Sequence, residues 1–328
     1  MTQPFLSTMW APTDPSWNES VRVLEHRRLG LRDLREFRRA AGQARVVILR
    51  GSVSFAERYR DLVLALAAKR LGNRPEVVIT DATWEQSSAA MERRLPARLR
   101  PLVPKLARSV MRLLDSPRVH YCVLSRDEQA SFPATWGVSP ARVHFTAFPH
   151  TLYDGAADMP THDGGYVFAG GNSLRDYDLL EQALGGTAVE VHIAARWRPR
   201  AAANLQARTL THEEFVADLA GCSVCVVPLK KTIRSAGQQT YLNAMALGKL
   251  VIVTEAAGVT DYVVDGVTGV VVPADPAALR AAVLDALDPG RRDHYAAIAA
   301  RGRQVARERF NEFSYREELL AIAQNASD

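Results

Sequence analysis

Cysteine is scarce in this chain of 328 residues, which contains only Cys122, Cys222 and Cys225. So few cysteines cannot build a disulfide framework, and this favours a reducing compartment. Long hydrophobic runs are missing as well: a stretch such as Leu62–Ala68 is far shorter than the ~20 apolar residues that span a bilayer. Residues Met1–Trp10 lack the basic and apolar regions of a secretory signal. We therefore expect a cytoplasmic protein with no membrane-spanning segment.

Motifs of several cofactor and metal proteins are also missing. No G-x-G-x-x-G follows a predicted strand, which argues against a nicotinamide dehydrogenase. Cys222 and Cys225 form one C-x-x-C pair without a second, so we expect a packing role instead of a zinc site. Nucleic acid is not an expected partner, because the most basic stretch contains no aromatic residue and no nucleic-acid-binding motif is recognisable.

The chain does have the composition of a soluble globular protein, with 47% hydrophobic and 23% charged residues. At roughly 150 residues per domain, its length suggests two domains. The net charge of +5 is unevenly distributed, because residues 92–118 contain eight basic and two acidic residues. This basic stretch predicts a partner that carries negative charge.

Short apolar runs alternate with helical patterns throughout the chain, which predicts an α/β fold with mostly parallel sheets. Periodicity lapses between Pro149 and Gly164, where we place a linker between two doubly wound halves. Ligands of such sheets bind at the carboxyl ends of the strands, so we expect a cleft there. The predicted helices include 20–41, 55–71, 126–136 and 176–184. The predicted strands are 46–49, 77–80, 119–124, 142–145, 166–168, 189–194, 223–227 and 250–254.

One segment points to phosphate binding. Ser235–Thr254 predicts a turn of small residues, a short helix, Gly248 as its C-cap and a buried strand. A helix N-terminus preceded by Ala236 and Gly237 offers free backbone N–H groups and the positive end of a helix dipole. An anionic group such as a phosphate is the expected ligand.

Three blocks of the second half resemble a known family. Ala244-Met-Ala-Leu-Gly-Lys249, Asp265-Gly-Val-Thr-Gly-Val-Val-Val-Pro273 and the glycine turn that follows Phe168 are similar to retaining GT-B glycosyltransferases related to glycogen and sucrose synthases. The resemblance covers about residues 143–313. It implies two Rossmann-like domains facing across a cleft: an acceptor-side domain at 1–150, a nucleotide-sugar domain at 151–308, and a C-terminal helix at 309–328 packing on the first domain. It also implies a nucleoside-diphosphate-sugar donor, no catalytic metal and no other cofactor.

The sequence departs from the family where carboxylates are usual. Ser235 and Asn243 occupy the positions of its two glutamates, Asn172 replaces its arginine, and Arg175 stands in for its lysine. Asn243 could still hydrogen-bond a ribose, and Ser235 a sugar hydroxyl. The predicted donor-binding residues are Gly170, Gly171, Asn172, Arg175, Ser235, Ala236, Gly237, Gln238 and Asn243.

Catalytic roles are predicted for three residues. Arg175 would stabilise the departing diphosphate, and Asp81 after a buried strand or His150 in the linker would face the acceptor. Helix capping by Asp81 and a solvated position for Arg175 are the structural alternatives. No persuasive covalent nucleophile is present, so the resemblance implies front-face displacement with retention.

The basic stretch predicts an amphipathic helix over Lys105–Leu114, suited to an anionic membrane surface or a lipid phosphate. A solvated helix packed on the first domain is the alternative. We therefore expect a cytoplasmic glycosyltransferase that can bind the inner face of a membrane through residues 92–118. A GT-B sugar-nucleotide epimerase and a catalytically weak partner subunit remain alternative functions.

Overall fold

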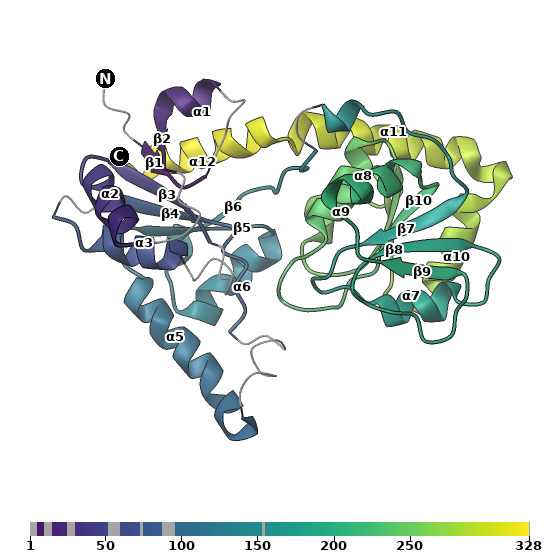
Figure 1. Ribbon diagram of the computed structural model, residues 1–328, viewed down its shortest axis with the longest axis horizontal. Helices are drawn as coiled ribbons and strands as arrows, with labels where there is room; N and C mark the ends of the chain where they lie inside the picture. The colour runs from purple at the N-terminus through teal and green to yellow at the C-terminus, as the bar shows by residue number, and fades with distance from the viewer. Residues whose placement is uncertain are drawn as a thin grey trace. The chain divides into compact units, whose positions relative to one another are not determined.

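The computed structural model describes residues 5–9, 15–24, 30–51, 60–72, 75–86, 96–152 and 155–327. The chain folds into two compact units. The first contains residues Met1–Thr146 and Arg316–Asp328, and the second contains Ala147–Tyr315. Figure 1 labels the helices and strands of both units.

The first unit is built on a six-stranded parallel sheet with strand order β2-β1-β3-β4-β5-β6. Its strand order reverses between β1 and β3, which pair directly. The strands are β1 (Phe5–Ser7), β2 (Val21–Val23), β3 (Val46–Arg50), β4 (Glu76–Thr80), β5 (Val119–Val123) and β6 (Val143–Phe145). The helices are α1 (Pro15–Ser20), α2 (Leu31–Ala41), α3 (Arg60–Lys69), η1 (Ala97–Leu102), α5 (Val103–Leu114), α6 (Arg126–Trp136) and η2 (Pro140–Arg142).

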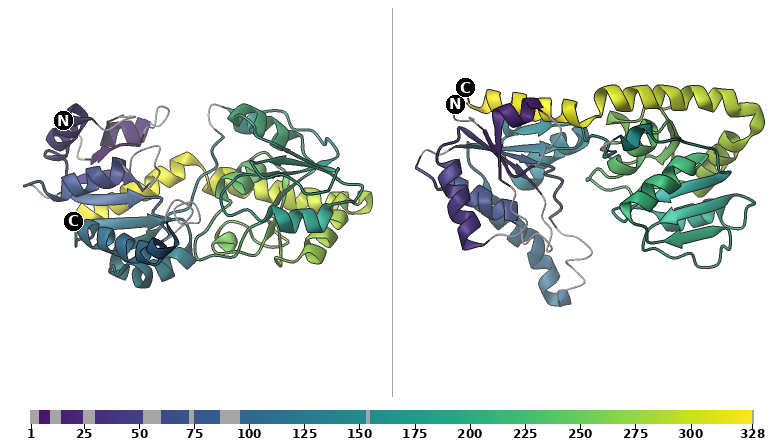
Figure 2. Two further views of the ribbon diagram at one scale, coloured as in Figure 1. Left: turned by 60° about the horizontal axis from the view of Figure 1, so that its bottom comes forward. Right: turned by 45° about the horizontal axis from the view of Figure 1, so that its top comes forward.

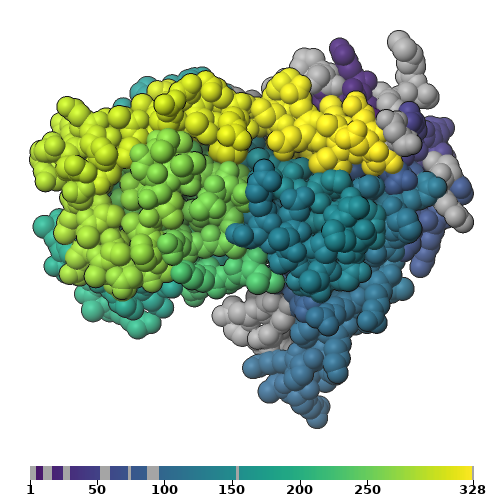
Figure 3. All heavy atoms as spheres, turned by 180° about the vertical axis from the view of Figure 1, so that it is seen from behind, coloured from purple at the N-terminus to yellow at the C-terminus, as the bar shows by residue number. Residues whose placement is uncertain are grey.

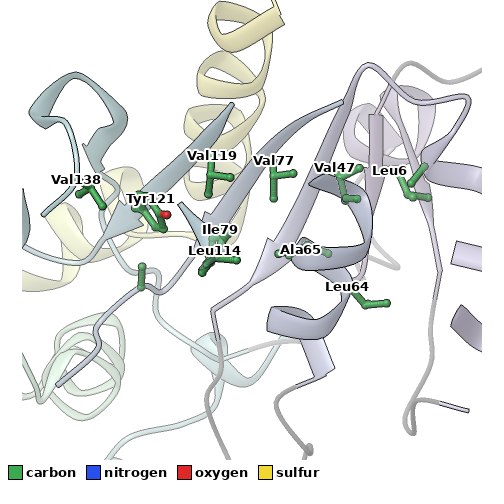
Figure 4. Close-up of a cluster of buried hydrophobic side chains, with 14 of the residues drawn as sticks. Leu6, Val47, Leu64, Ala65, Val77, Ile79, Leu114, Val119, Tyr121 and Val138 are labelled. Atoms are coloured by element: carbon green, nitrogen blue, oxygen red, sulfur yellow. The ribbon is translucent and has the colours of Figure 1, made fainter. Parts of the chain in front are cut away.

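The core of this unit follows the two-residue period of its strands. Val47 and Leu49 of β3 enter the same apolar cluster as Val77 and Ile79 of β4, whereas the residues between them point to the other face. Helices α2, α3, α5 and α6 cover this cluster, several of whose side chains are drawn in Figure 4.

The second unit has a six-stranded parallel sheet with strand order β12-β11-β10-β7-β8-β9. Its helices lie on both faces of the sheet (Figure 2). The strands are β7 (Tyr166–Gly170), β8 (Glu190–Ala194), β9 (Leu205–Arg208), β10 (Val224–Val227), β11 (Leu250–Thr254) and β12 (Val270–Val272). The helices are η3 (Ala156–Asp158), α7 (Tyr177–Leu184), α8 (His212–Gly221), α9 (Gln238–Ala246), η4 (Val259–Asp261), α10 (Pro276–Leu287), η5 (Pro289–Arg291) and α11 (Arg292–Arg309). Helix α12 (Glu312–Ser327) continues the chain from the second unit into the first.

Local sequence signals fix several helix ends. Ser125 caps α6 by accepting a hydrogen bond from the Glu128 N–H at 3.0 Å, and Gly137 ends the helix in the left-handed region. Thr211 and Glu214 form a reciprocal capping box at the start of α8. Strands and helices alternate along the chain as predicted, and both sheets are parallel, so the predicted α/β fold class is confirmed.

Some predicted elements differ from the structure. The single helix predicted over 20–41 is wrong in its first part, because Val21–Val23 form strand β2 beside β1. Valine is β-branched and packs well in this parallel pair, where Val21 is buried. Strands β1 and β9 were not expected, because β1 has only three residues and β9 contains a single large apolar residue, Leu205. The first residues of the helix predicted over 55–71 and residues 92–95 of the basic stretch lie outside the described residues.

No helix within the described ranges combines the length and apolar character needed to span a bilayer. All three cysteines are buried and unbridged. Burial raises the pKa of each thiol, including that of Cys222 to about 12. The thiols therefore remain protonated at neutral pH and serve as packing groups.

Candidate functional site

The strand order of the second sheet reverses between β7 and β10, which pair directly. The loops that leave the carboxyl ends of two such strands diverge and leave room for a ligand between them. Here these loops are residues 171–176 after β7 and residues 228–237 after β10. Most of the predicted donor-binding residues fall in these two loops or at the start of α9.

Glycine is required at two consecutive positions, the last residue of β7 and the first residue of the loop after it, for different structural reasons. A Cβ on Gly170 would lie 2.4 Å from the Phe215 ring, and one on Gly171 would lie 2.8 Å from Arg175 Nη2. Gly171 also has φ +101°, a conformation that side chains disfavour. Leu174 in the same loop has φ +54° although it is not a glycine, which indicates a backbone held under local strain.

Arg175 is used to hold this loop together. Its Nε donates to the Gly170 carbonyl at 2.9 Å, its Nη1 to the Ser173 carbonyl at 2.7 Å, and its Nη2 to Thr240 Oγ1 at 3.1 Å. The last bond connects the β7 loop to the first turn of α9. Burial lowers the pKa of the Arg175 guanidinium from its ordinary value, but an arginine stays charged at neutral pH.

The two loops are also connected through their backbones. Asp176 N–H donates to the Pro228 carbonyl and Lys230 N–H to the Leu174 carbonyl, both at 2.9 Å. Arg175 and Leu229 form an isolated antiparallel bridge. The loops therefore form one structural element beside the strand-order reversal.

Helix α9 begins at this junction with Gly237 as its N-cap, at φ +99°. The Gly237 carbonyl accepts from the N–H groups of Thr240 and Tyr241. The N–H groups of Gln238 and Gln239 lie in the first turn, where no intrahelical acceptor exists. This end of α9 therefore has the donors and the dipole that an anion requires.

Ser235 and Gln238 occupy buried positions beside that helix end, with exposed fractions of 3% and 6%. Gln238 Nε2 donates to Ser235 Oγ at 2.8 Å. Ala236 lies between Ser235 and the cap and is also buried. Because Ser235, Ala236 and Gly237 are small, the turn that precedes α9 can pack closely.

Arg234 belongs to this site, although sequence reasoning did not single it out. Its Nη2 donates to Ser173 Oγ at 3.0 Å, so its guanidinium spans from the β10 loop to the β7 loop. Its Nε is buried and has no hydrogen-bond partner among the described residues. Its position immediately before Ser235 is the only sequence signal that could have indicated it.

Two other predicted residues have protein partners. Asn172 is exposed, and its Oδ1 accepts from the Arg196 N–H at 2.9 Å, which fixes the β7 loop to the loop after β8. Asn243 is fully buried, and its Oδ1 accepts from the Thr151 N–H at 2.7 Å while its Nδ2 donates to Thr151 Oγ1 at 3.1 Å. A ribose contact by Asn243 stays a prediction, and it would have to compete with Thr151.

His150 precedes this Thr151 contact. Its N–H donates to the Phe310 carbonyl at 2.7 Å, while its Nδ1 is buried without a partner among the described residues. Burial and the nearby Arg307 lower the pKa of His150, so the imidazole is neutral at pH 7. A neutral imidazole can accept a proton, as the predicted catalytic role requires.

Asp81 lies in the first unit, directly after β4, with φ +52°. The Gly51 N–H at the end of the neighbouring strand donates to the Thr80 carbonyl at 2.5 Å, and Trp84 Nε1 donates to the Gly51 carbonyl at 2.6 Å. Asp81 thus stands in a strained turn at the carboxyl edge of its sheet.

Asp61 is a second carboxylate of the first unit, which the sequence analysis did not consider. It is 4% exposed, accepts from Thr8 Oγ1 at 3.4 Å, and pairs with Arg60 at 2.8 Å. Thr8 directly follows β1, so this carboxylate lies near the strand-order reversal of the first sheet.

Acidic residues near the candidate site are engaged in structural bonds. Asp176 caps α7 by accepting from the Leu179 N–H at 3.1 Å, and Asp178 accepts from Trp197 Nε1 at 3.2 Å. Among the described residues, no group of three or more His, Cys, Asp or Glu side chains is arranged to hold a metal ion.

Part of the second unit is similar to a known protein family. Residues 178–289 match the family model of the glycosyl transferases group 1. No curated protein sequence matches the chain.

Solved structures resemble the chain over nearly its whole length. HepE of Anabaena in complex with UDP-glucose is 14% identical, with a TM-score of 0.64 over 98% of this chain and 91% of that one. A glycosyltransferase from Rickettsia africae is 10% identical, with a TM-score of 0.62 over 99% and 90% of the two chains. The sucrose-phosphate synthase of Thermosynechococcus elongatus is 15% identical, with a TM-score of 0.61 over 97% and 87%.

At these identities the structural likeness establishes the fold, which is GT-B. The match of residues 178–289 adds a likeness to the group 1 glycosyl transferases within the second unit. The chain is accordingly a transferase with the GT-B fold.

Proposed function

We propose that the protein transfers a sugar from a nucleoside-diphosphate sugar to an acceptor hydroxyl, and that the donor diphosphate binds where the β7 and β10 loops meet the start of α9. One observation carries the proposal: the Arg234 guanidinium, with a buried and unpartnered Nε among the described residues, lies beside a helix N-terminus at a strand-order reversal. The group 1 domain and the HepE complex with UDP-glucose support the donor class. UDP is therefore the first nucleotide to test.

Arg234 supplies the positive charge that the usual arginine would supply at Asn172. As the glycosidic bond breaks, negative charge grows on the diphosphate, so a guanidinium and oriented backbone N–H groups stabilise the transition state more than the bound donor. Arg175 positions the glycine turn and the first turn of α9 through its three hydrogen bonds.

We propose further that transfer retains the anomeric configuration and needs no metal ion. The group 1 domain supports the first statement only through the resemblance of its motifs to retaining enzymes. Transfer without a metal ion is supported by the positive groups at the site. The Arg234 guanidinium and the N-terminus of α9 would neutralise the charge of the diphosphate. The candidate bases for the acceptor hydroxyl are Asp81 of the first unit and His150 of the second unit.

Titration calorimetry of the full chain with UDP, UMP, GDP and ADP tests the diphosphate site. Arg234→Ala should weaken nucleoside-diphosphate affinity tenfold to a hundredfold, because a charge-assisted hydrogen bond contributes about 1.5–3 kcal/mol. UMP, which lacks the second phosphate, should lose much less. Added chelator should leave all affinities unchanged.

Arg208→Ala is the matched control, since Arg208 is an exposed arginine of the same unit whose partner is Asp218 at 2.9 Å. It should bind nucleotide as the wild type does. Unchanged affinity in Arg234→Ala, or a loss of the same size for UMP, would contradict the proposed site. A large chelator effect would contradict metal-independent binding.

Once a donor is known, NMR of the product made from it decides the stereochemistry. Retention predicts the same anomeric configuration in donor and product, and inversion would overturn that part of the proposal.

A further inference from the structure

The outer side of η1 and α5 carries a continuous row of exposed apolar side chains. The row consists of Leu99, Leu102, Leu106, Val110 and Leu113, whose exposed fractions run from 40% to 66%. The spacings of three, four, four and three residues place them on one line, because residues three apart stack on a 3₁₀-helix and residues three or four apart share a face of an α-helix. Large apolar side chains in such a row would normally be buried, so this row indicates a contact surface.

A second row on the same helix is basic. Lys105, Arg108 and Arg112 are exposed and repeat at three and four residues, about a third of a turn from the apolar row. None of the three has an ion-pair partner among the described residues. Residues 96–114 include five basic residues and no acidic one.

The third side of α5 faces its own unit. Val103, Met111 and Leu114 are buried, and the last two belong to the core cluster with α3. Lys69 of α3 donates through Nζ to the carbonyls of Leu113 and Asp115, which fixes the end of α5. In Figure 1 the helix extends away from the sheet of the first unit, and Figure 3 shows one of its faces at the surface.

We propose that η1 and α5 form a docking surface for an anionic phospholipid bilayer. The helix would lie in the plane of the interface, with the apolar row inserted among the acyl chains and the basic row against the headgroups. Charge complementarity selects this partner: a purely apolar partner would leave three charges unpaired, and an acidic soluble molecule would leave the leucines exposed to water.

Co-sedimentation of the full chain with vesicles tests the proposal. Vesicles with about 30% phosphatidylglycerol in phosphatidylcholine should pellet the protein, and pure phosphatidylcholine should not. Lys105→Gln/Arg108→Gln/Arg112→Gln should weaken binding on the order of a hundredfold, since each basic residue near an anionic leaflet strengthens binding by roughly fivefold. Leu106→Ser/Leu113→Ser should weaken it by at least about tenfold, because two buried leucines are lost.

The first unit offers a closely matched control. Arg32, Arg35 and Arg39 of α2 are also exposed and have the same spacing of three and four residues. Arg32→Gln/Arg35→Gln/Arg39→Gln removes the same charge and should keep most of the binding. Nucleotide affinity should be unchanged in all of these variants, because the candidate nucleotide site lies in the second unit.

An environment-sensitive fluorophore on Leu106→Cys reports insertion directly. The native cysteines are buried, so labelling is selective. The emission should shift to the blue on anionic vesicles only.

Any of four results would overturn the proposal. The first two are that the protein does not pellet with anionic vesicles, or that it pellets equally with neutral ones. The other two are that the α2 variant loses as much vesicle binding as the α5 variant, or that the emission of the label does not shift. A dimer in solution that Leu106→Ser/Leu113→Ser dissociates, without vesicle binding, would assign the row to a second copy of the chain.

Discussion

The two arginines of the candidate site differ in what their guanidinium groups contact. Arg175 donates to three protein acceptors, two of which are the backbone carbonyls of Gly170 and Ser173. Arg234 donates to one hydroxyl, Ser173 Oγ, and retains a buried Nε without a partner among the described residues. A ligand phosphate can therefore engage Arg234 with less rearrangement.

Arg175→Ala should lower stability as well as turnover. It removes the donor of the Ser173 carbonyl and of Thr240 Oγ1, while the Gly170 carbonyl still accepts from Thr240 Oγ1 at 3.3 Å. Losing such bonds costs about 1–3 kcal/mol where the groups stay buried. Turnover should fall on the order of a hundredfold, because the loop that positions the diphosphate loosens. Thermal unfolding and transfer rate, measured on the same preparation, separate the two effects. An unchanged melting temperature with lost turnover would instead assign Arg175 to direct contact with the donor.

Gly237→Val should damage both folding and nucleotide binding. The residue has φ +99°, and a Cβ there would lie 3.1 Å from the Tyr241 ring and 3.2 Å from Val227 Cγ1. Strain of this kind costs about 1–3 kcal/mol. The added branch would also obstruct an anion at the start of α9.

Gly186→Val provides the comparison for that variant, because Gly186 has φ +73° but open space around it. It should lose stability without losing nucleotide affinity. Equal affinity in the two variants would remove Gly237 from the candidate site.

The site shows where residue-level sequence reasoning reaches its limit. The glycine turns and the start of α9 could be predicted, because positive φ and helix ends leave local signals in the sequence. Arg234 could not, since its position before Ser235 is its only local signal and its partner Ser173 is distant in the chain. Asn243 was assigned from a motif, but its burial against Thr151 depends on tertiary packing.

At the scale of elements, strands β5 and β6 bring two histidines together. His120 Nδ1 lies 3.0 Å from His144 Nε2, with the rings stacked, and His120 Nε2 lies 3.6 Å from Glu76 Oε2. Burial, and then the charges of His144 and Arg142, lower the pKa of His120 to about 4. His120 is therefore neutral at pH 7, and its contact with Glu76 is not an ion pair at that pH.

This pair predicts acid sensitivity of the first unit. Because the folded pKa lies below the unfolded value of 6.5, the unfolded chain binds more protons between about pH 4 and 6.5. The stabilisation that depends on neutral His120 is therefore fully present above pH 6.5. As the pH falls through this window, the free energy of unfolding decreases by about 1–3 kcal/mol. His120→Gln should flatten the pH dependence of urea unfolding between about pH 6.5 and 4.5. A variant with the same slope as the wild type would show that other groups dominate.

Elements were predicted best where apolar runs are long and bounded by clear breakers. Strand β11 and helix α6 have the predicted bounds, since one is a fully buried β-branched run and the other has both caps. Strands β1 and β2 have three residues each and become strands only through their pairing with each other and with β3. A local window cannot contain that information.

At the scale of the whole molecule, alternating patterns and the motif blocks of the second half were enough to predict the GT-B fold. The first half has few such motifs, and the side chains that its fold brings together leave no signature in the sequence. Asp61 is an example, because its contact with Thr8 joins residues that lie 53 positions apart in the chain.

The proposed diphosphate site can be tested by a crystal structure of the full chain with the nucleoside diphosphate that binds most tightly. We expect the diphosphate within hydrogen-bonding distance of the Gln238 and Gln239 N–H groups, with Arg234 turned from Ser173 to a phosphate oxygen. A diphosphate bound away from the β7 and β10 loops, with Arg234 still on Ser173, would contradict it.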